Sequence, residues 1–233
     1  SRKDVAPDLP PKSRIPIPIE MTNEQRKLYD EIEEDMIIEL KAGGWMLAQT
    51  VLTKILRMRQ LLICPKLIDP SLGYGTSLEQ IVEDVEGLNE SHCMIFTPYV
   101  KAIPFIEEAI RQKFPSIAIT HFQGGLSPKA IYDRQEYIKD KRGIAITSIL
   151  FAEAFSIETM SYGFFCGYDW DPYNNEQAED RIYRLTTQEP VFHYYYKYRN
   201  ASTEDRLSEI LDHKTYSNQT YLKDIERRYK NDW

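Results

Sequence analysis

Closely spaced cysteines and histidines, the usual ligands of structural metal sites, are missing from this sequence. Three cysteines and four histidines are scattered over 233 residues, and no Cys-x-x-Cys pair occurs. Structural zinc sites usually take closely spaced Cys and His ligands, and a disulfide framework needs several pairs of cysteines, so we expect neither. Cys93 and Cys166 lie in apolar, strand-like runs, where we expect buried, reduced thiols.

Long hydrophobic runs are missing as well. A membrane-spanning helix needs roughly 18 or more consecutive apolar residues, and no segment approaches that length. The first residues, Ser1-Arg2-Lys3-Asp4, are polar and lead into a proline-rich stretch instead of an apolar signal sequence. We therefore expect no membrane contact and an intracellular location, cytoplasmic in a bacterial or phage-infected cell and nuclear in a eukaryote.

The chain has no excess of basic residues. Its formal net charge is −7, from 29 Lys and Arg against 36 Asp and Glu. Proteins that coat nucleic acid without sequence preference are usually basic. Any contact with nucleic acid must therefore come from a local basic patch, because the net negative charge of the chain repels phosphates.

Both parts of a self-contained nucleotide site are missing. No G-x-x-x-x-G-K-[ST] phosphate loop occurs. Asp30-Glu31-Ile32-Glu33 has the letters of an acidic magnesium box, but it falls in an amphipathic helical pattern. There a solvated helix face is the expected role.

The first third of the chain predicts an extended lead-in followed by a helical arm. Residues 1–19 carry five prolines, and residues 15–20 are consistent with a short edge strand. Thr22 and Gln25 form a capping box that starts a helix. That helix has an apolar stripe and ends at Gly43-Gly44, and a second helix covers residues 45–63. The stripe consists of Leu28, Ile32, Met36 and Leu40.

From residue 92 the pattern changes to strands alternating with helices. Short apolar runs lie at 93–96, 117–120, 144–147, 163–168 and 191–198, with helical patterns between them, one of them at residues 174–184. Such alternation predicts an α/β fold, a parallel sheet with helices on both faces. We divide the chain into a lead-in (1–20), a helical arm with a connecting loop (21–90), an α/β core (91–200) and C-terminal helices (201–233).

The sharpest cluster of functional residues follows the fourth apolar run. Asp169-Trp170-Asp171-Pro172 precedes a helical pattern that carries Gln177, Arg181 and Arg184. Two arginines three residues apart on a helix project from one face and offer planar forks to phosphate oxygens. The alternative is a solvated helix face on which Glu179 and Asp180 neutralise the arginines.

These residues resemble motif VI of the Swi/Snf-like branch of superfamily-two helicases, which reads D-x-x-W-N-P and then Q-A-x-x-R-x-x-R. Other segments resemble further motifs of that family in the correct order, so the resemblance spans roughly residues 3–210. They are Leu9-Pro10-Pro11-Lys12, Gln25 to Tyr29, Leu56 to Pro65, Ile95-Phe96-Thr97, Gln123-Gly124-Gly125 with Arg134, Ile144 to Ser148, and Thr203-Glu204-Asp205. The resemblance implies the second, RecA-like lobe of a DNA translocase.

The resemblance also implies roles for individual residues. Arg181 and Arg184 would be arginine fingers for ATP, which binds with Mg mainly on a missing first RecA-like lobe, supplied in cis or in trans. Gln177 and Asp180 would lie at the nucleotide. Thr97, Gly124 and Ser148 would lie over the backbone of double-stranded DNA, where hydroxyl and backbone donors hold phosphates without reading sequence.

Two further features have competing interpretations. A basic cluster on the second helix, Lys54, Arg57, Arg59 and Lys66, is either a phosphate contact, with Arg57 as our candidate, or a plain helix surface. The run Tyr194-Tyr195-Tyr196 is either a base-stacking platform or, as we expect, cross-strand packing.

The sequence departs from the family at motif V. The usual G-G-x-G-x-N is here Phe151-Ala152-Glu153-Ala154-Phe155-Ser156, and the middle His of motif VI is Tyr183. This divergence is consistent with a phage or mobile-element origin. We expect the chain alone to hydrolyse no ATP. The competing readings are a degenerate module that binds protein or DNA without ATP turnover and, less favoured, an RNA helicase lobe, against which the long helical arm argues.

Overall fold

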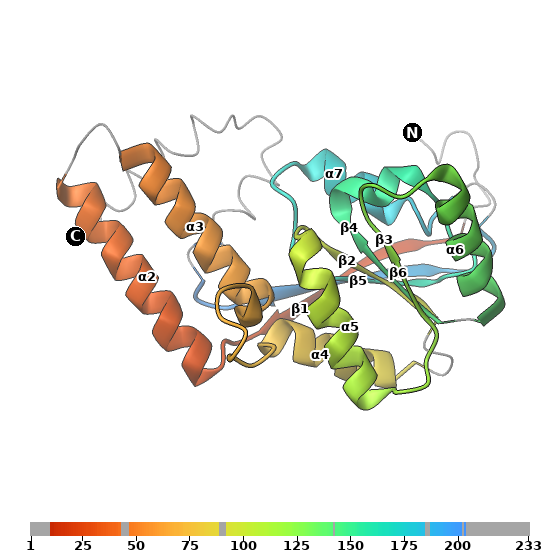
Figure 1. Ribbon diagram of the computed structural model, residues 1–233, viewed down its shortest axis with the longest axis horizontal. Coiled ribbons are helices and arrows are strands. Elements are labelled where there is room, and N and C mark those ends of the chain that lie inside the picture. The colour runs from red at the N-terminus through yellow and green to blue at the C-terminus, as the bar shows by residue number, and fades with distance from the viewer. Residues whose placement is uncertain are drawn as a thin grey trace. The chain divides into compact units, whose positions relative to one another are not determined.

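We describe the protein from a computed structural model, which defines residues 10–42, 47–88, 92–141, 143–184, 187–201 and 203. Helices and strands occupy most of these ranges (Figure 1). The strands are β1 (Lys12–Ile19), β2 (Cys93–Thr97), β3 (Ile119–Phe122), β4 (Ile144–Ser148), β5 (Tyr162–Phe165) and β6 (Val191–Tyr198). The α-helices are α2 (Asn23–Ala42), α3 (Leu47–Ile63), α4 (Thr76–Glu86), α5 (Ile103–Lys113), α6 (Pro128–Lys141) and α7 (Pro172–Glu179). Three short 3-10 helices are η1 (Pro65–Leu67), η2 (Val100–Ala102) and η3 (Ile149–Ala154).

The six strands form one parallel sheet in the order β1-β6-β5-β2-β4-β3. Neighbouring strands from β6 to β3 pair in parallel register. At the β1 edge, Val191 N donates to Pro11 O and Arg199 N donates to Ile19 O, so the two strands advance in the same direction. The predicted α/β fold with a parallel sheet is confirmed.

The strand order places helices on both faces. Right-handed crossovers that step in opposite directions along a parallel sheet fall on opposite faces. The step from β2 to β3 carries α5, whereas the steps back from β3 through β6 carry α6 and α7. Figure 1 accordingly shows α5 on one side of the strands and α7 on the other.

The core is the centre of this sheet. Every residue of β2 and of β4 is buried, as expected for strands covered on both faces. The outer strand β3 buries alternate residues, which is typical of an edge strand. Neighbouring aromatic side chains stack between β5 and β6, with Phe164 on Tyr194 and Phe165 on Tyr195. The predicted cross-strand packing of the tyrosine run is therefore confirmed.

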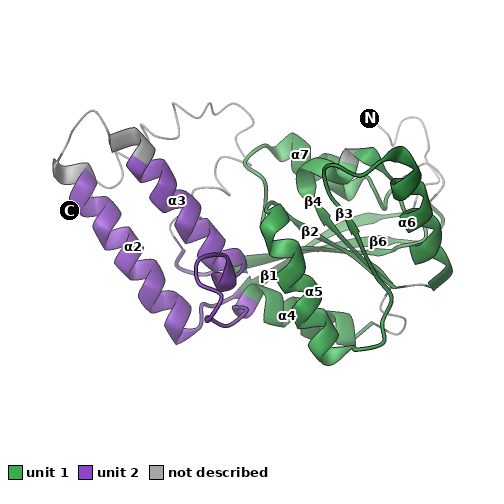
Figure 2. Cartoon of the chain, in the orientation of Figure 1, with its two compact units in different colours: residues 1–18, 77–197 green, residues 19–76, 198–233 purple. Residues whose placement is uncertain are grey.

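The chain divides into two compact units (Figure 2). Unit 1 comprises residues 1–18 and 77–197, and unit 2 comprises residues 19–76 and 198–233. The predicted capping box is confirmed in unit 2, because Gln25 N donates to Thr22 Oγ1 at 3.1 Å and Thr22 N to Gln25 Oε1 at 3.2 Å. The predicted C-terminal helices lie outside the described residues, except at Thr203.

Three details differ from the sequence expectation. The buried stripe of α2 runs through Gln25, Tyr29 and Met36, so Leu28 lies beside it and is only half-buried. β3 begins at Ile119 instead of residue 117, because Ile117 N donates to Phe114 O and completes the turn after α5. α7 ends at Glu179 instead of residue 184.

The basic cluster expected on α3 is not one surface. Arg59 is 3% exposed, and Lys54 Nζ pairs with Glu39 at 3.0 Å. Lys66 lies beyond α3 with its Nζ 4.7 Å from the centroid of the Tyr74 ring. Arg57 alone of the four is exposed. Among the described helices, none combines the length and the apolar character that crossing a membrane requires.

Candidate functional site

The residues predicted to contact the DNA backbone lie together at the carboxyl edge of the sheet. Thr97 ends β2 and Ser148 ends β4, and the two are register partners. Gly124 follows β3, the next strand along, and lies exposed in open space. In open parallel sheets, ligand sites form at this edge. Thr97 is fully buried and its Oγ1 accepts a hydrogen bond from Tyr99 N at 3.4 Å, whereas Gly124 presents its backbone to solvent.

The turn from β5 into α7 is fixed by short polar side chains. Asp171 caps the helix by accepting from Tyr173 N at 2.9 Å, and Pro172 occupies the first turn. The buried Asn175 accepts from Asp169 N at 2.9 Å and donates to Asp169 O at 2.9 Å. The motif at residues 169–172 thus holds the start of α7 rigidly against the sheet edge.

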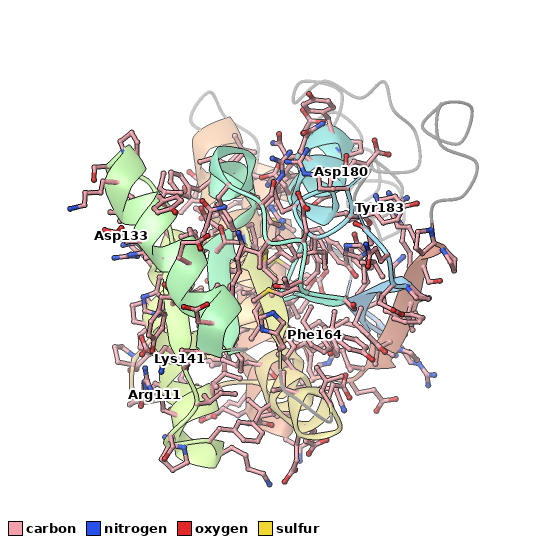
Figure 3. All side chains as sticks on the ribbon, turned by 90° about the vertical axis from the view of Figure 1, so that its right-hand side faces the viewer. Arg111, Asp133, Lys141, Phe164, Asp180 and Tyr183 are labelled. Carbon is pink, nitrogen blue, oxygen red and sulfur yellow. The ribbon has the colours of Figure 1, made fainter. Side chains whose placement is uncertain are left out.

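Arg181 and Arg184 do not lie on α7, which corrects the expectation of one helix face. The helix ends at Glu179, and the Arg181 side chain explains why. Arg181 Nε donates to Gln177 O at 2.8 Å, which is the carbonyl that continued α-helix would use, while Arg181 N turns to Ala178 O. Figure 3 shows Asp180 and Tyr183 in the turn that follows.

Arg181 is 6% exposed and belongs to the interior of this turn. Its Nη2 donates to Gln177 Oε1 at 3.0 Å and its Nη1 to Phe155 O at 3.5 Å. The structure therefore brings Gln177 and Arg181 together, as the sequence predicts. It also directs the Arg181 guanidinium toward backbone and amide oxygens of its own chain.

Arg184 is half-buried and bound to a neutral group. Its Nε and Nη2 both donate to Ser156 Oγ, at 3.0 and 2.5 Å. Its backbone N donates to Thr187 Oγ1 at 2.7 Å. Within the described part of the chain, no carboxylate neutralises this guanidinium. A fixed cation without an ion-pair partner is suited to binding an anion.

The neighbouring acids bind other cations. Glu179 is fully buried, and its two carboxylate oxygens accept from Arg14 Nε at 2.6 Å and Arg14 Nη2 at 2.8 Å. Lys12 Nζ lies 2.6 Å from Glu179 and 3.2 Å from Asp180, and Tyr195 OH also donates to Glu179. The alternative in which Glu179 neutralises the arginines of motif VI is therefore not the observed arrangement.

The electrostatics of Glu179 follow from these contacts. Burial alone would raise the pKa of Glu179, but the Arg14 hydrogen bonds and the Lys12 charge outweigh it and lower the pKa to about 2. The hydrogen bond with Glu179 raises the pKa of Arg14. Burial lowers the pKa of His193, whose Nε2 bonds Glu179 O at 3.2 Å, to about 4. His193 is therefore neutral near pH 7.

The motif V segment is packed with apolar groups instead of glycine. Phe155 is 4% exposed, and its ring stacks on Phe122 with centroids 3.8 Å apart. Ala152 is fully buried. Ser156, which stands where the family has Asn, is the acceptor for Arg184. Motif V thus keeps a polar link to motif VI at one position while its glycine positions are filled.

Sequence reasoning missed the cations that surround Glu179. Lys12 and Arg14 alternate along β1, so both project from one face of that strand. That alternation was visible in the sequence, but their buried partner was not, because Glu179 is 165 residues from Arg14 along the chain. Among the described residues, no three His, Cys, Asp or Glu side chains are grouped so as to hold a metal ion.

Comparisons with known proteins agree with this architecture. No protein-family model matches the chain. An "uncharacterized ATP-dependent helicase" of Mycoplasma pneumoniae is 24% identical over 217 residues. The match covers 90% of this chain but only 21% of that protein, so the chain spans about a fifth of the relative's length.

Solved structures of Swi2/Snf2-type ATPases share the fold. The C-terminal part of the Fun30 ATPase domain superposes with a TM-score of 0.74 at 12% identity, over 96% of this chain and 99% of that one. The Sulfolobus solfataricus SWI2/SNF2 ATPase C-terminal domain gives 0.72 at 15% identity, over 94% and 97%. The core of that ATPase in complex with dsDNA gives 0.73 at 19% identity, over 94% of this chain and 47% of that one. The chain thus has a RecA-like fold, that of the C-terminal lobe of Swi2/Snf2-type ATPases.

Proposed function

We propose that this chain is the second motor lobe of an ATP-dependent DNA translocase. In this role Arg184 reaches ATP that binds, with Mg, on a first RecA-like lobe supplied in cis or in trans. Arg181 shares the task or, by holding Gln177 and Phe155 O, shapes the turn that presents Arg184. The observation that carries the proposal is the half-buried Arg184 guanidinium, which the Ser156 hydroxyl holds and which no carboxylate among the described residues neutralises.

The chemistry of the proposal is electrostatic. Phosphoryl transfer gathers negative charge on the transferred group, and an arginine finger stabilises that charge. Arg184 meets this need because its partner is a hydroxyl, which a phosphate oxygen can replace without separating an ion pair. Motif V supports this turn through Ser156, whose hydroxyl holds Arg184, and through Phe155 O, which accepts from Arg181.

Contact with duplex DNA is proposed for the carboxyl edge of the sheet. Thr97, Ser148 and Gly124 lie there on or after three adjacent strands. Thr97 and Ser148 are buried, so Gly124 is the one of the three that is exposed. Gly124 offers an open backbone, and the phosphate backbone is held by such donors independently of base sequence. The dsDNA complex of the Sulfolobus solfataricus SWI2/SNF2 ATPase core, whose fold is shared, supports this assignment.

DNA-stimulated ATP hydrolysis tests the proposal. The chain alone is expected to be inactive, and the polypeptide that also carries a phosphate loop and an acidic box is expected to be active. Replacing both Arg181 and Arg184 by alanine should lower kcat by about 10³-fold or more, since losing an arginine finger typically has that effect. Arg111→Ala, which removes an arginine paired with Glu107 elsewhere in unit 1, is the matched control. Activity that survives the double substitution would contradict the finger assignment.

One observation favours a second candidate, a module that binds protein or DNA without ATP turnover. The three glycine positions of motif V are occupied by Phe151, Ala152 and Ala154. The next residue, Phe155, stacks its ring on Phe122. Side chains there prevent the close backbone approach that glycine permits. If no first lobe restores ATP hydrolysis while duplex binding persists, this candidate replaces the motor.

A further inference from the structure

Residues 10–14, the start of β1 and the two residues before it, contact the end of α7 and the turn that follows it at five points. Arg14 and Lys12 bind Glu179, and Lys12 also binds Asp180. Tyr183 OH donates to Pro10 O at 3.0 Å. Lys12 Nζ lies 5.6 Å from the centroid of the Tyr183 ring. The same short segment therefore bonds both the residue that ends α7 and the residue directly before Arg184.

We propose that residues 10–14 are a positioning element for Arg184. The proposal deepens the function given above and rests on it. Arg14, Lys12 and Tyr183 bond other groups of the chain, so in this proposal they act through the backbone that carries Arg184. They fix the backbone of residues 179–184 and thereby set where the guanidinium of Arg184 lies.

The segment is itself anchored, which lets it serve as a reference point. Val191 N donates to Pro11 O at 3.1 Å, so β6 holds the segment in the sheet. Glu179 receives a further hydrogen bond from Tyr195 on β6, the same strand. The turn is thus tied to β1 and to β6 through one carboxylate. A side chain with three partners in fixed elements has little freedom to rotate.

Three hydrogen bonds support the backbone around Arg184. Tyr183 OH ties the residue before Arg184 to Pro10, and Arg184 N donates to Thr187 Oγ1 on the following side. Ile157 N donates to Arg181 O at 3.0 Å, which ties the same turn to the end of motif V. Tyr183 stands where the resemblance places a histidine, so the bond to Pro10 is a feature of this chain. Small misplacements of a catalytic group lower rates strongly, by about a hundredfold for 1 Å.

Hydrogen exchange of the purified chain tests the positioning without any enzyme assay. Arg14→Met and Tyr183→Phe should raise amide exchange in residues 180–184 by about tenfold or more, while β2 and β4 keep their protection. Arg14→Lys should restore most of the protection, because Lys retains one charged donor to Glu179. Tyr196→Phe is the matched control, since it removes a tyrosine hydroxyl bonded to Asp84 at 2.5 Å on the same strand as Tyr195. If Arg14→Met leaves residues 180–184 as protected as before, or raises exchange equally throughout the sheet, the proposal is wrong.

Kinetics of the polypeptide that contains both lobes supply the second readout. Tyr183→Phe is a small change that keeps the ring, so it tests the bond even if Arg14→Met fails to fold. We expect kcat to fall by about threefold to tenfold with KM for ATP unchanged, because the first lobe binds the nucleotide. A fall in protection with no ATPase activity in the unsubstituted protein would refute the motor function and leave the positioning supported. Unchanged protection together with unchanged kcat would refute the positioning alone.

Discussion

Glu179 is a charged group with no exposed surface, and such a group is stable only when donors surround it. Its partners differ in their access to water. The Arg14 side chain is 54% exposed, whereas that of Lys12 is 21% exposed. Loss of the carboxylate therefore leaves cations that can turn to solvent, whereas loss of Arg14 leaves a buried anion with a single cation. The two substitutions should differ in cost for this reason.

We expect Arg14→Met to lower the free energy of unfolding by about 3 kcal/mol and Glu179→Gln by about 2 kcal/mol. Lys139→Gln, which breaks an exposed pair with Glu136, should change it by less than about 0.5 kcal/mol. Urea titrations of the three variants measure these differences. Equal effects for Arg14→Met and Lys139→Gln would mean that the Glu179 cluster is no more important than a surface pair.

Acid should destabilise unit 1 in two stages. Burial lowers the pKa of His193 from 6.5 to about 4, so between these values the unfolded chain binds a proton that the folded chain does not. Stability therefore falls as pH drops from 6.5 to 4, by at most about 3 kcal/mol. Burial alone would raise the pKa of Glu179, but Arg14 and Lys12 lower it from 4.5 to about 2. Folding stability therefore continues to fall as the pH drops from 4.5 to about 2.

The pH dependence of urea midpoints measures both stages. His193→Gln should flatten the curve between pH 6.5 and 4 and leave the lower window in place. A variant curve that runs parallel to that of the unsubstituted protein above pH 4 would exclude His193 as the titrating group.

At the scale of the element, one side chain organises the start of unit 2. Gln25 is 1% exposed, and its Oε1 accepts from Thr22 N and Thr76 N, both at 3.2 Å. Its Nε2 donates to Leu61 O at 3.0 Å and to Tyr198 OH at 3.3 Å. Gly75 leaves room for it, because a Cβ there would lie 2.6 Å from Gln25 Nε2. Gln25, the partner of Thr22 in the capping box, therefore also joins Leu61 and Tyr198 to Thr76.

We expect Gln25→Ala to destabilise unit 2 by about 3 kcal/mol, since several buried backbone groups lose their partner at once. Gly75→Ala should be destabilising as well, because its φ is +83° and the added methyl group meets Gln25. Asn23→Ala at the exposed start of α2 is the control and should change stability by less than about 0.5 kcal/mol. Thermal unfolding followed by circular dichroism separates the two classes.

The elements that the sequence predicted well are those that local pattern decides. The buried strands β2 and β4 are continuous apolar runs in the sequence. The capping box of Thr22 and Gln25 marks the start of α2. The end of α7 was missed because Arg181 uses its own side chain to occupy Gln177 O, and helical periodicity does not record that choice. The partners of Glu179 on β1 were missed because Arg14 lies 165 residues away from it along the chain. Candidate residues were thus found by motif, while their surroundings depended on long-range contacts.

At the scale of the whole molecule, charge limits how the chain can bind DNA. The net charge is −7, and the proposed contacts at the carboxyl edge, Thr97, Gly124 and Ser148, are neutral. Neutral donors hold phosphates without displacing counterions, so salt should matter less than for a basic protein. Arg57 is exposed on α3, and it is the one cation that we propose as a contact to the DNA phosphate backbone.

We therefore expect duplex binding by the chain to weaken only gently with salt, with a slope of log K against log salt of about −1 to −2. Arg57→Gln should bring that slope closer to zero by about 1, because one phosphate contact no longer releases a counterion. Lys139→Gln, which removes a cation already paired with Glu136, should leave it unchanged. Anisotropy of a labelled duplex between about 50 and 200 mM salt measures all three slopes. A slope steeper than about −5 would mean that many cations meet the DNA, as in proteins that coat it, and a shallow slope insensitive to Arg57→Gln would move the charged contact to another residue.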